Sequence, residues 1–176
     1  MTRSQLLSRA KKIRLFVLDV DGVLTDRRII LDSNGTHVKS FDVRDGFGLV
    51  LARQAGIKVA IITAEESHVV TLRAQQLKID WVAQAARDKG HAFQECLKHF
   101  RVSPQQMSYM GDDLLDLPVL RRVGFAATVA DAPPEVKEHV HYVAKCRGGR
   151  GAVREVVELF LRAQGHWDDI VGRYLQ

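Results

Sequence analysis

Short apolar runs alternate with helical patterns along most of this sequence, and no other feature constrains the fold as strongly. The runs expected to form buried strands are residues 15–18, 58–62, 81–83, 107–110 and 124–127. The expected helices lie near residues 45–55, 66–77, 89–100, 113–122 and 151–164. Strand–helix alternation is typical of a central parallel sheet with helices on both faces, connected by right-handed crossovers. The sequence therefore predicts the α/β class.

Length and composition favour one folded domain over residues 1–176, with a C-terminal tail from about 146 to 176. The chain has 176 residues, of which 46% are hydrophobic and 27% charged, as in ordinary globular proteins. Its 13 glycines and 4 prolines show no period, which excludes a repeat or collagen-like architecture. Cys96 and Cys146 lack CxxC spacing. This argues against a disulfide framework or a zinc site and fits a cytoplasmic protein.

The charge balance points to an anionic partner. The formal net charge is +5, but the basic residues are scattered and aromatic residues make up only 7%. An anionic small molecule is therefore favoured over a nucleic acid. The apolar runs are shorter than the roughly 20 residues that span a bilayer, so we expect no membrane partner.

One segment, about residues 27–41, reads as a β-hairpin rather than as part of the alternation. Residues 27–31 and 36–41 would pair across a turn in which Asn34-Gly35 supplies positive φ values. It is too short for a second domain. Its exposed edge and the apolar residues 29–31 suggest packing against another subunit. The alternative is a hairpin that lies on its own domain, and both interpretations stay open.

Two acids follow the first predicted strand directly, in Asp19-Val-Asp21-Gly22. Ligands of an open parallel sheet bind at the carboxyl ends of its strands. Asp19 and Asp21 are two residues apart, so they can face the same crevice if the chain stays extended. Two carboxylates this close repel each other unless a cation lies between them, which implies a hard divalent metal ion. Gly22 allows a sharp turn immediately afterwards.

Further polar groups follow the later strands: Thr63, Lys89 and the segment Gly-Asp-Asp-Leu-Leu-Asp at 111–116. Each has an ordinary structural interpretation when taken alone. Thr63 and Glu66 have capping-box spacing, Lys89 could be a solvated surface lysine, and Gly-Asp-Asp could cap the next helix. Together and in this order they predict one site.

Asp19-x-Asp21, Thr63, Lys89 and Gly111-Asp112-Asp113-x-x-Asp116 resemble the four motifs of the haloacid-dehalogenase-like phosphatases. The chain further resembles one branch of that family, the 3-deoxy-D-manno-octulosonate (KDO) 8-phosphate phosphatases, which act in lipopolysaccharide precursor synthesis. Residues 41–48, 129–132 and 148–155 carry this wider match. The resemblance implies a Rossmann-like haloacid-dehalogenase fold that is capless, with only the short hairpin inserted.

The resemblance also implies a mechanism, hydrolysis of a phosphate ester through an aspartyl-phosphate. Asp19 is then the nucleophile and Asp21 the acid and base. Thr63 donates a hydrogen bond to the phosphoryl group, and Lys89 neutralises its charge. Mg²⁺ is expected on the Asp19 carboxylate, the Asp21 backbone carbonyl and Asp112. Supporting roles behind the metal or Lys89 fall to Asp113 and Asp116.

For the substrate, the resemblance implies a phosphorylated sugar acid. The expected substrate-binding residues are Asp42, Val43, Arg44, Asp45, Gly46, Glu65, Arg73, Lys89 and Arg150. A homotetramer is also implied, in which hairpins associate and the Gly148–Gly151 tail reaches a neighbour's site. Arg150 could meet a substrate anion there.

Two positions depart from the octulosonate pattern. Ala64-Glu65 stands where those enzymes usually have Gly-Arg, and Val50 stands where a basic residue is common. Glu65 at this place resembles phosphatases of nine-carbon ulosonate 9-phosphates, of the 2-keto-3-deoxynononate or sialic-acid type, so that substrate remains an alternative. A phospho-accepting receiver module is an alternative of another class. Receiver modules usually have adjacent acids at the first strand, so Asp19-x-Asp21 and the late Gly-Asp-Asp argue against this assignment.

Overall fold

A parallel sheet of six strands forms the centre of the protein, as the computed structural model of the chain shows for residues 1–175. The strand order is β5-β4-β1-β6-β7-β8, and every pairing is parallel. The strands are β1 (Leu15–Leu18), β4 (Lys58–Ile62), β5 (Trp81–Ala83), β6 (Met107–Met110), β7 (Phe125–Thr128) and β8 (Tyr142–Val143). The predicted α/β class and parallel sheet are confirmed.

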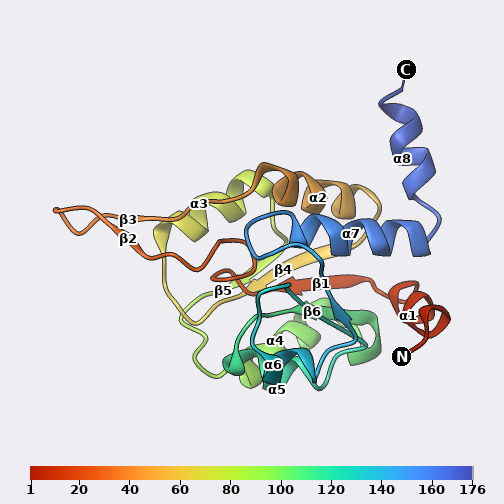
Figure 1. Cartoon of the computed structure of the whole chain (residues 1–176), viewed down its shortest axis with the longest axis horizontal. Coiled ribbons are helices and arrows are strands. Elements are labelled where there is room, and N and C mark those ends of the chain that lie inside the picture. The colour runs from red at the N-terminus through yellow and green to blue at the C-terminus, as the bar shows by residue number, and fades with distance from the viewer. Residues whose placement is uncertain (176) are drawn as a thin grey trace.

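Helices cover both faces of this sheet (Figure 1). One layer holds α2 (Val43–Gln54), α3 (His68–Leu77) and α7 (Ala152–Ala163). The other holds α4 (Lys89–Phe100), α5 (Leu117–Leu120) and α6 (Pro134–Lys137). The remaining elements are α1 (Arg3–Ala10), α8 (Trp167–Arg173) and two short 3₁₀ turns, η1 (Pro104–Gln106) and η2 (Leu114–Asp116). None of the helices in the described part is long and apolar enough to cross a bilayer.

The central strands are mostly apolar because both of their faces are covered. All four residues of β1 and of β6 are buried. Phe160 of α7 anchors its helix on the sheet, with its ring edge-on to Phe16 at 5.3 Å and to Phe125 at 5.0 Å between centroids. This packing fixes α7 over the strands that carry the site.

The sheet topology brings the predicted polar residues to one edge. From β1 the chain builds outward on one side through β4 and β5, and on the other through β6, β7 and β8. Leu18 lies opposite Ile61 and Met110 in the ladders. The residues that follow these three strands therefore meet at the carboxyl edge, where ligands bind in open α/β sheets.

The hairpin exists, but its ladder is shorter than predicted. β2 (Ile30–Leu31) pairs with β3 (His37–Val38), and the ribbon projects from the body beyond α3 (Figure 1). Asn34 does not take a positive φ; only Gly35 does, at 78°. The Asp32 side chain closes the loop instead, by accepting hydrogen bonds from the N–H groups of Asn34 and Thr36. Isolated two-stranded ribbons are marginal in water, which accounts for the short ladder.

The other differences from the predicted elements lie at their ends. The helix expected near 113–122 is broken into η2 and the single turn α5, because Pro118 lacks the N–H that a continuous helix needs. The third helix begins at His68 with Ser67 as its N-cap, so Thr63 and Glu66 form no capping box. The short elements α1, α6, α8 and β8 were not predicted.

Candidate active site

Asp19 and Lys89 meet at the carboxyl edge of β1. Lys89 is the first residue of α4, and Asp88 caps that helix by accepting from the His91 N–H. The Lys89 Nζ lies 2.8 Å from Asp19 Oδ2 and 2.6 Å from Asp116 Oδ1. All three side chains are buried. Burial, together with the charge of Asp116, raises the pKa of Asp19 to about 7 despite the ammonium group.

Asp116 supports the site rather than opening onto it. Its Oδ1 accepts hydrogen bonds from Lys89 and from the Tyr109 hydroxyl, both at 2.6 Å. Its Oδ2 accepts from the backbone N–H groups of Asp112 and Asp113, at 2.9 and 3.1 Å. Four donors occupy the lone pairs of this carboxylate. Asp116 therefore fixes both Lys89 and the loop that carries Asp112.

Asp112 completes a cluster that suits a divalent cation. Oxygens of Asp19, Asp112 and Asp116 lie within 4.8 Å of one another. Asp116 already accepts from four donors, whereas Asp19 and Asp112 have fewer partners and offer carboxylate oxygens of the kind that hard cations such as Mg²⁺ prefer. Burial and the charge of Asp19 raise the pKa of Asp112 to about 7. The chain thus leaves two buried carboxylates incompletely neutralised, which fits a bound cation.

Asp21 lies at the same edge but is held by a different cation. Both of its carboxylate oxygens accept from Lys39 Nζ, at 2.6 and 2.7 Å, and Thr25 Oγ1 lies at 3.3 Å. Lys39 follows β3 of the hairpin and also contacts Glu65. Lys39 therefore links the base of the hairpin to its own chain's site, whereas β2 and β3 are exposed and project from the body. Contact with another subunit stays a prediction.

The Gly148–Gly151 segment is not a free tail. Gly149 N–H donates to Val23 O at 2.9 Å, and Gly148 N–H donates to Asp131 at 3.2 Å. A Cβ on Gly148 would come within 1.7 Å of Gly22 O, so only glycine lets the two loops approach this closely. Within one chain this segment packs on the loop that follows β1, and its contact with a neighbour's site stays a prediction.

Arg150 and Arg27 lie beside this contact. Arg150 is mostly exposed and pairs with Asp26 at 3.3 Å. Arg27 lies 3.6 Å from Asp112 Oδ2 and also pairs with Asp131. The Arg27 guanidinium thus brings positive charge to the rim of the acidic cluster, where an anionic ligand would be attracted.

Residues 42–46 divide into structural and exposed positions. Asp42 caps α2 by accepting from the N–H groups of Arg44 and Asp45, and Val43 and Arg44 are exposed. Asp45 is buried, and its carboxylate accepts from the Gly151 and Arg154 N–H groups at the start of α7. Burial raises the pKa of Asp45 to about 6. Its carboxylate therefore ties α2 to α7 within this chain.

Gly46 and Arg73 lie against each other on α2 and α3. A Cβ on Gly46 would come within 2.3 Å of an Arg73 nitrogen. Arg73 also lies over the Phe41 ring at 5.5 Å and donates to Gln76.

Thr63 lies buried directly after β4, at the carboxyl edge of the sheet. The structure thus brings together Asp19, Asp21, Thr63, Lys89, Asp112 and Asp116, while Asp113 caps η2.

Three residues of the site were missed by the sequence reasoning: Lys39, Arg27 and Tyr109. Only Tyr109 left a signal, because a tyrosine in a buried strand needs a partner for its hydroxyl. Lys39 lies 18 positions from Asp21 and Arg27 lies 85 positions from Asp112 (112 − 27), so only the folded chain brings each pair together.

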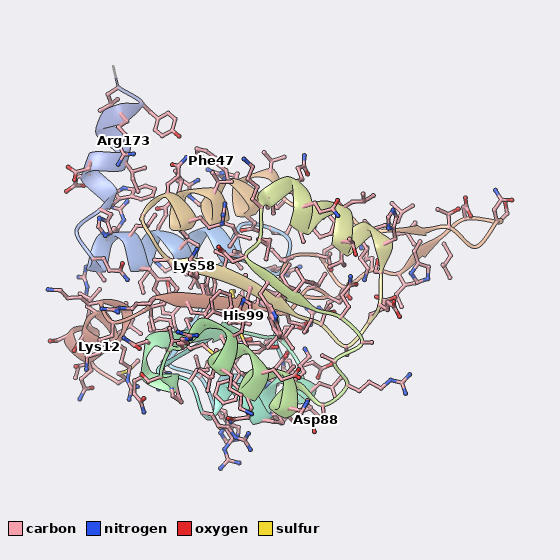
Figure 2. All side chains as sticks on the ribbon, turned by 180° about the vertical axis from the view of Figure 1, so that it is seen from behind. Lys12, Phe47, Lys58, Asp88, His99 and Arg173 are labelled. Atoms are coloured by element: carbon pink, nitrogen blue, oxygen red, sulfur yellow. The ribbon has the colours of Figure 1, made fainter. Side chains whose placement is uncertain are left out.

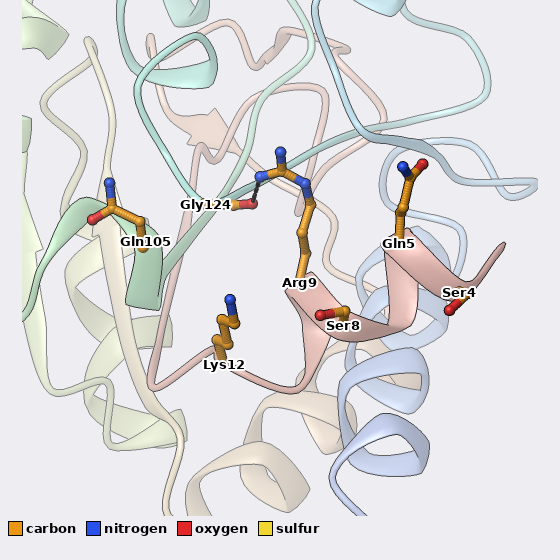
Figure 3. A pocket seen from close by; sticks show the side chains of 7 residues that line it. All are labelled: Ser4, Gln5, Ser8, Arg9, Lys12, Gln105 and Gly124. Carbon is orange, nitrogen blue, oxygen red and sulfur yellow. Dashed lines mark hydrogen bonds between the residues drawn. The ribbon is translucent and has the colours of Figure 1, made fainter. Parts of the chain in front are cut away.

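A separate hollow of about 480 Å³ lies at the opposite edge of the sheet (Figure 3). Its lining includes Arg9, Lys12, Gln105 and Gly124, and Arg9 donates to Gly124 O at 2.8 Å. Lys12, which lines this hollow, lies at the left in Figure 2, well away from Asp88, the residue before Lys89. The hollow adjoins the amino ends of the strands and has no acid in its lining, so the acidic cluster at the carboxyl edge is the candidate site.

We expect Gly22→Ala to weaken Mg²⁺ binding at least tenfold. Gly22 has φ +91°, and a Cβ there would come within 1.9 Å of Asp112 Oδ2, so the carboxylate must move. Isothermal titration with MgCl₂ measures this. Gly35→Ala is the matched control, since it has a similar φ of +78° but no atom within 4 Å of the new Cβ. Backbone strain costs each variant about 1–2 kcal/mol. Equal Mg²⁺ affinity in both variants would contradict the assignment of Asp112.

Comparison with known proteins agrees with this geometry. The family of haloacid dehalogenase-like hydrolases matches residues 57–156. The chain is 42% identical to the 3-deoxy-D-manno-octulosonate 8-phosphate phosphatase KdsC of Escherichia coli K12, over 97% of this chain and 90% of that protein.

Two solved structures extend the likeness. The same phosphatase from Moraxella catarrhalis, in complex with magnesium, phosphate and KDO, is 39% identical, with TM-score 0.96 and 98% and 99% of the chains covered. The cobalt-bound enzyme of Haemophilus influenzae is 38% identical, with TM-score 0.87 and 89% and 92% covered. The chain therefore belongs to the haloacid dehalogenase-like hydrolases, and over nearly its whole length it resembles their octulosonate phosphatases.

Proposed function

We propose that this hydrolase is a magnesium-dependent phosphatase that converts 3-deoxy-D-manno-octulosonate 8-phosphate into KDO and phosphate. The observation that carries the proposal is the buried cluster of Asp19, Lys89, Asp112 and Asp116 at the carboxyl end of β1. It combines a nucleophilic carboxylate, a fixed ammonium group and carboxylate oxygens that can bind a cation. These are the groups that phosphoryl transfer needs.

The reaction proceeds in two steps on the chain's own residues. Asp19 attacks phosphorus, and the phosphate–sugar oxygen bond breaks as Asp21 gives a proton to the leaving oxygen. Asp21 then takes a proton from water, which attacks the aspartyl-phosphate and releases phosphate. Lys89, fixed by Asp116, neutralises negative charge on Asp19 and the phosphoryl group, and Thr63 donates a hydrogen bond to that group.

Asp19, Asp112 and the Asp21 carbonyl would hold Mg²⁺. When bound, the cation neutralises the repulsion between the carboxylates and the substrate phosphate. The four-donor support of Asp116 keeps the Asp112 loop in place for this role.

The eight-carbon substrate is favoured although Glu65 departs from the octulosonate pattern. The Glu65 carboxylate does not stand alone: Lys39 Nζ lies 2.5 Å from its Oε2, and His37 Nδ1 lies 3.4 Å from its Oε1. The hydrogen bond from Lys39 keeps the pKa of Glu65 low. A carboxylate paired in this way repels the sugar carboxylate less than an unpaired one. The nine-carbon ulosonate 9-phosphate stays the second candidate because Glu65 replaces an arginine.

A substrate panel tests this assignment. We expect kcat/KM for octulosonate 8-phosphate to exceed that for the nine-carbon 9-phosphate, with p-nitrophenyl phosphate as the substrate that carries no sugar acid. Glu65→Arg should leave this order unchanged. A higher kcat/KM for the nine-carbon ester, reversed by Glu65→Arg, would favour the second candidate. Membership among the hydrolases, rather than the receiver modules, predicts multiple turnovers on all active substrates.

Ile29, Ile30, Leu31 and Val38 expose apolar surface on the hairpin, which supports association of subunits, and a homotetramer in the cytoplasm is our expectation. We also propose that residues 1–176 form one domain. Light scattering of the purified enzyme measures the oligomeric state directly.

A further inference from the structure

Lys39 joins three segments of the chain at the catalytic edge. Its Nζ lies 2.6 and 2.7 Å from the two carboxylate oxygens of Asp21 and 2.5 Å from Glu65 Oε2. These residues belong to the hairpin, the loop after β1 and the loop after β4. The Lys39 side chain is only 7% exposed, whereas those of Asp21 and Glu65 are 39% and 41% exposed. The Lys39 ammonium group is thus the most buried of the three charged groups, and both carboxylates contact it.

We propose that Lys39 is a positioning residue that holds the Asp21 carboxylate at the reaction centre, and that Glu65 holds Lys39. The inference rests on the proposed function, in which Asp21 transfers protons. Among the described residues, the other side chain that donates a hydrogen bond to Asp21 is Thr25, at a long 3.3 Å. A half-exposed aspartate with one weak contact has several rotamers open to it. The contact of one ammonium with both carboxylate oxygens leaves Asp21 a single orientation.

The orientation of the Asp21 carboxylate matters for proton transfer. The acid or base must lie within hydrogen-bond reach of the proton that it moves. A displacement of about 1 Å in a reacting group can cost a hundredfold in rate. Lys39 acts through Asp21, so its loss slows every substrate whose turnover uses Asp21. The hydrolysis of an aspartyl-phosphate is such a step, and it is the same whichever ester formed it.

A contrasting role for Lys39 is direct contact with the sugar carboxylate. The two roles separate on p-nitrophenyl phosphate, which has no carboxylate and no polyol. A positioning residue lowers kcat on both substrates. A substrate-binding residue raises KM for the sugar acid and leaves p-nitrophenyl phosphate unchanged.

The experiment compares Lys39→Met, Lys39→Arg, Glu65→Gln and the double variant Lys39→Met/Glu65→Gln, with Mg²⁺ saturating, on both substrates. Lys58→Met is the matched control, because Lys58 forms a similar 2.9 Å ion pair with Asp80 at the amino end of β4. We expect Lys39→Met to lower kcat on both substrates by about tenfold to a hundredfold, with KM changed less. Lys39→Arg should restore part of the rate, and Lys58→Met should match the wild type.

The double variant tests the role of Glu65. Glu65→Gln alone should lower kcat, but it should add nothing in the Lys39→Met background, because its effect passes through Lys39. Additive losses would overturn that part of the inference. An unchanged kcat for Lys39→Met on p-nitrophenyl phosphate would overturn the positioning role. The positioning role would also be overturned if the loss of kcat matched the fraction of unfolded protein, measured by circular dichroism, and Lys39→Arg restored none of the rate.

Assays of the wild-type enzyme distinguish a failure of this inference from a failure of the proposed function. If wild type hydrolyses p-nitrophenyl phosphate but not octulosonate 8-phosphate, the substrate assignment fails while the Lys39 comparison still stands on the aryl ester. If wild type is active on both and Lys39→Met equals it, the inference about Lys39 fails and the phosphatase assignment stands.

Discussion

Asp19→Asn is expected to lower turnover by at least about a thousandfold, since removal of a covalent nucleophile has effects of this size or larger. The amide nearly matches the carboxylate in shape but does not attack phosphorus. The fold should survive, because Lys89 keeps its 2.6 Å contact with Asp116. Steady-state hydrolysis of p-nitrophenyl phosphate with saturating Mg²⁺ measures the effect, and circular dichroism measures the fold.

Asp80→Asn serves as the control for the nucleophile. Asp80 is also a hydrogen-bonded aspartate, but it pairs with Arg53 and Lys58 away from the catalytic edge. We expect it to keep wild-type turnover per folded molecule. If Asp19→Asn retained more than a few per cent of wild-type kcat, the covalent mechanism would be wrong.

Metal removal is expected to abolish activity, and its effect on stability should depend on pH. Burial raises the pKa of Asp19 and Asp112 to about 7 from an ordinary value of 3.8. The folded, metal-free protein therefore binds protons more tightly than the unfolded chain. The stability from these two groups is fully present below about pH 4 and is lost as pH rises through 7. A cation that needs both carboxylates ionised binds more tightly as the pH rises over the same range.

Thermal unfolding in EDTA and in excess MgCl₂, at pH 5.5 and pH 8, tests this dependence. The rise in Tm caused by Mg²⁺ should be larger at pH 8, since ligand binding stabilises the folded state by mass action. Asp112→Asn should lose most of the Mg²⁺ response and, in EDTA, should destabilise less on going to pH 8 than wild type does. The same Mg²⁺-induced rise in Asp112→Asn and wild type would contradict the assignment. So would full phosphatase activity after exhaustive chelation.

The parts of the fold that follow from local pattern were predictable. A strand such as 15–18 is a continuous apolar run, because a sheet covered on both faces selects for one. The helix over 89–100 was predicted with its observed bounds. Short elements such as α6 and β8 carry too little periodicity to be seen. The break at Pro118 was missed because the apolar pattern continues across it.

The sequence by itself determined which central groups gather at the carboxyl edge of the sheet. Asp19, Thr63, Lys89 and Asp112 each follow a strand or begin a helix, and in a parallel sheet the strand ends meet at one edge whatever the lengths of the connections. Their convergence is thus a consequence of topology that can be read from the order of elements.

Only the tertiary structure decided which groups surround that centre. The contacts of Lys39 with Asp21, of Tyr109 with Asp116 and of Gly148 with the loop after β1 depend on how separate segments pack. Such contacts leave no periodic signal, because side-chain direction and loop path are set by neighbours distant in sequence. For the same reason Asp45, expected at the substrate, was found bonded to the first turn of α7, where burial rather than spacing fixes its role.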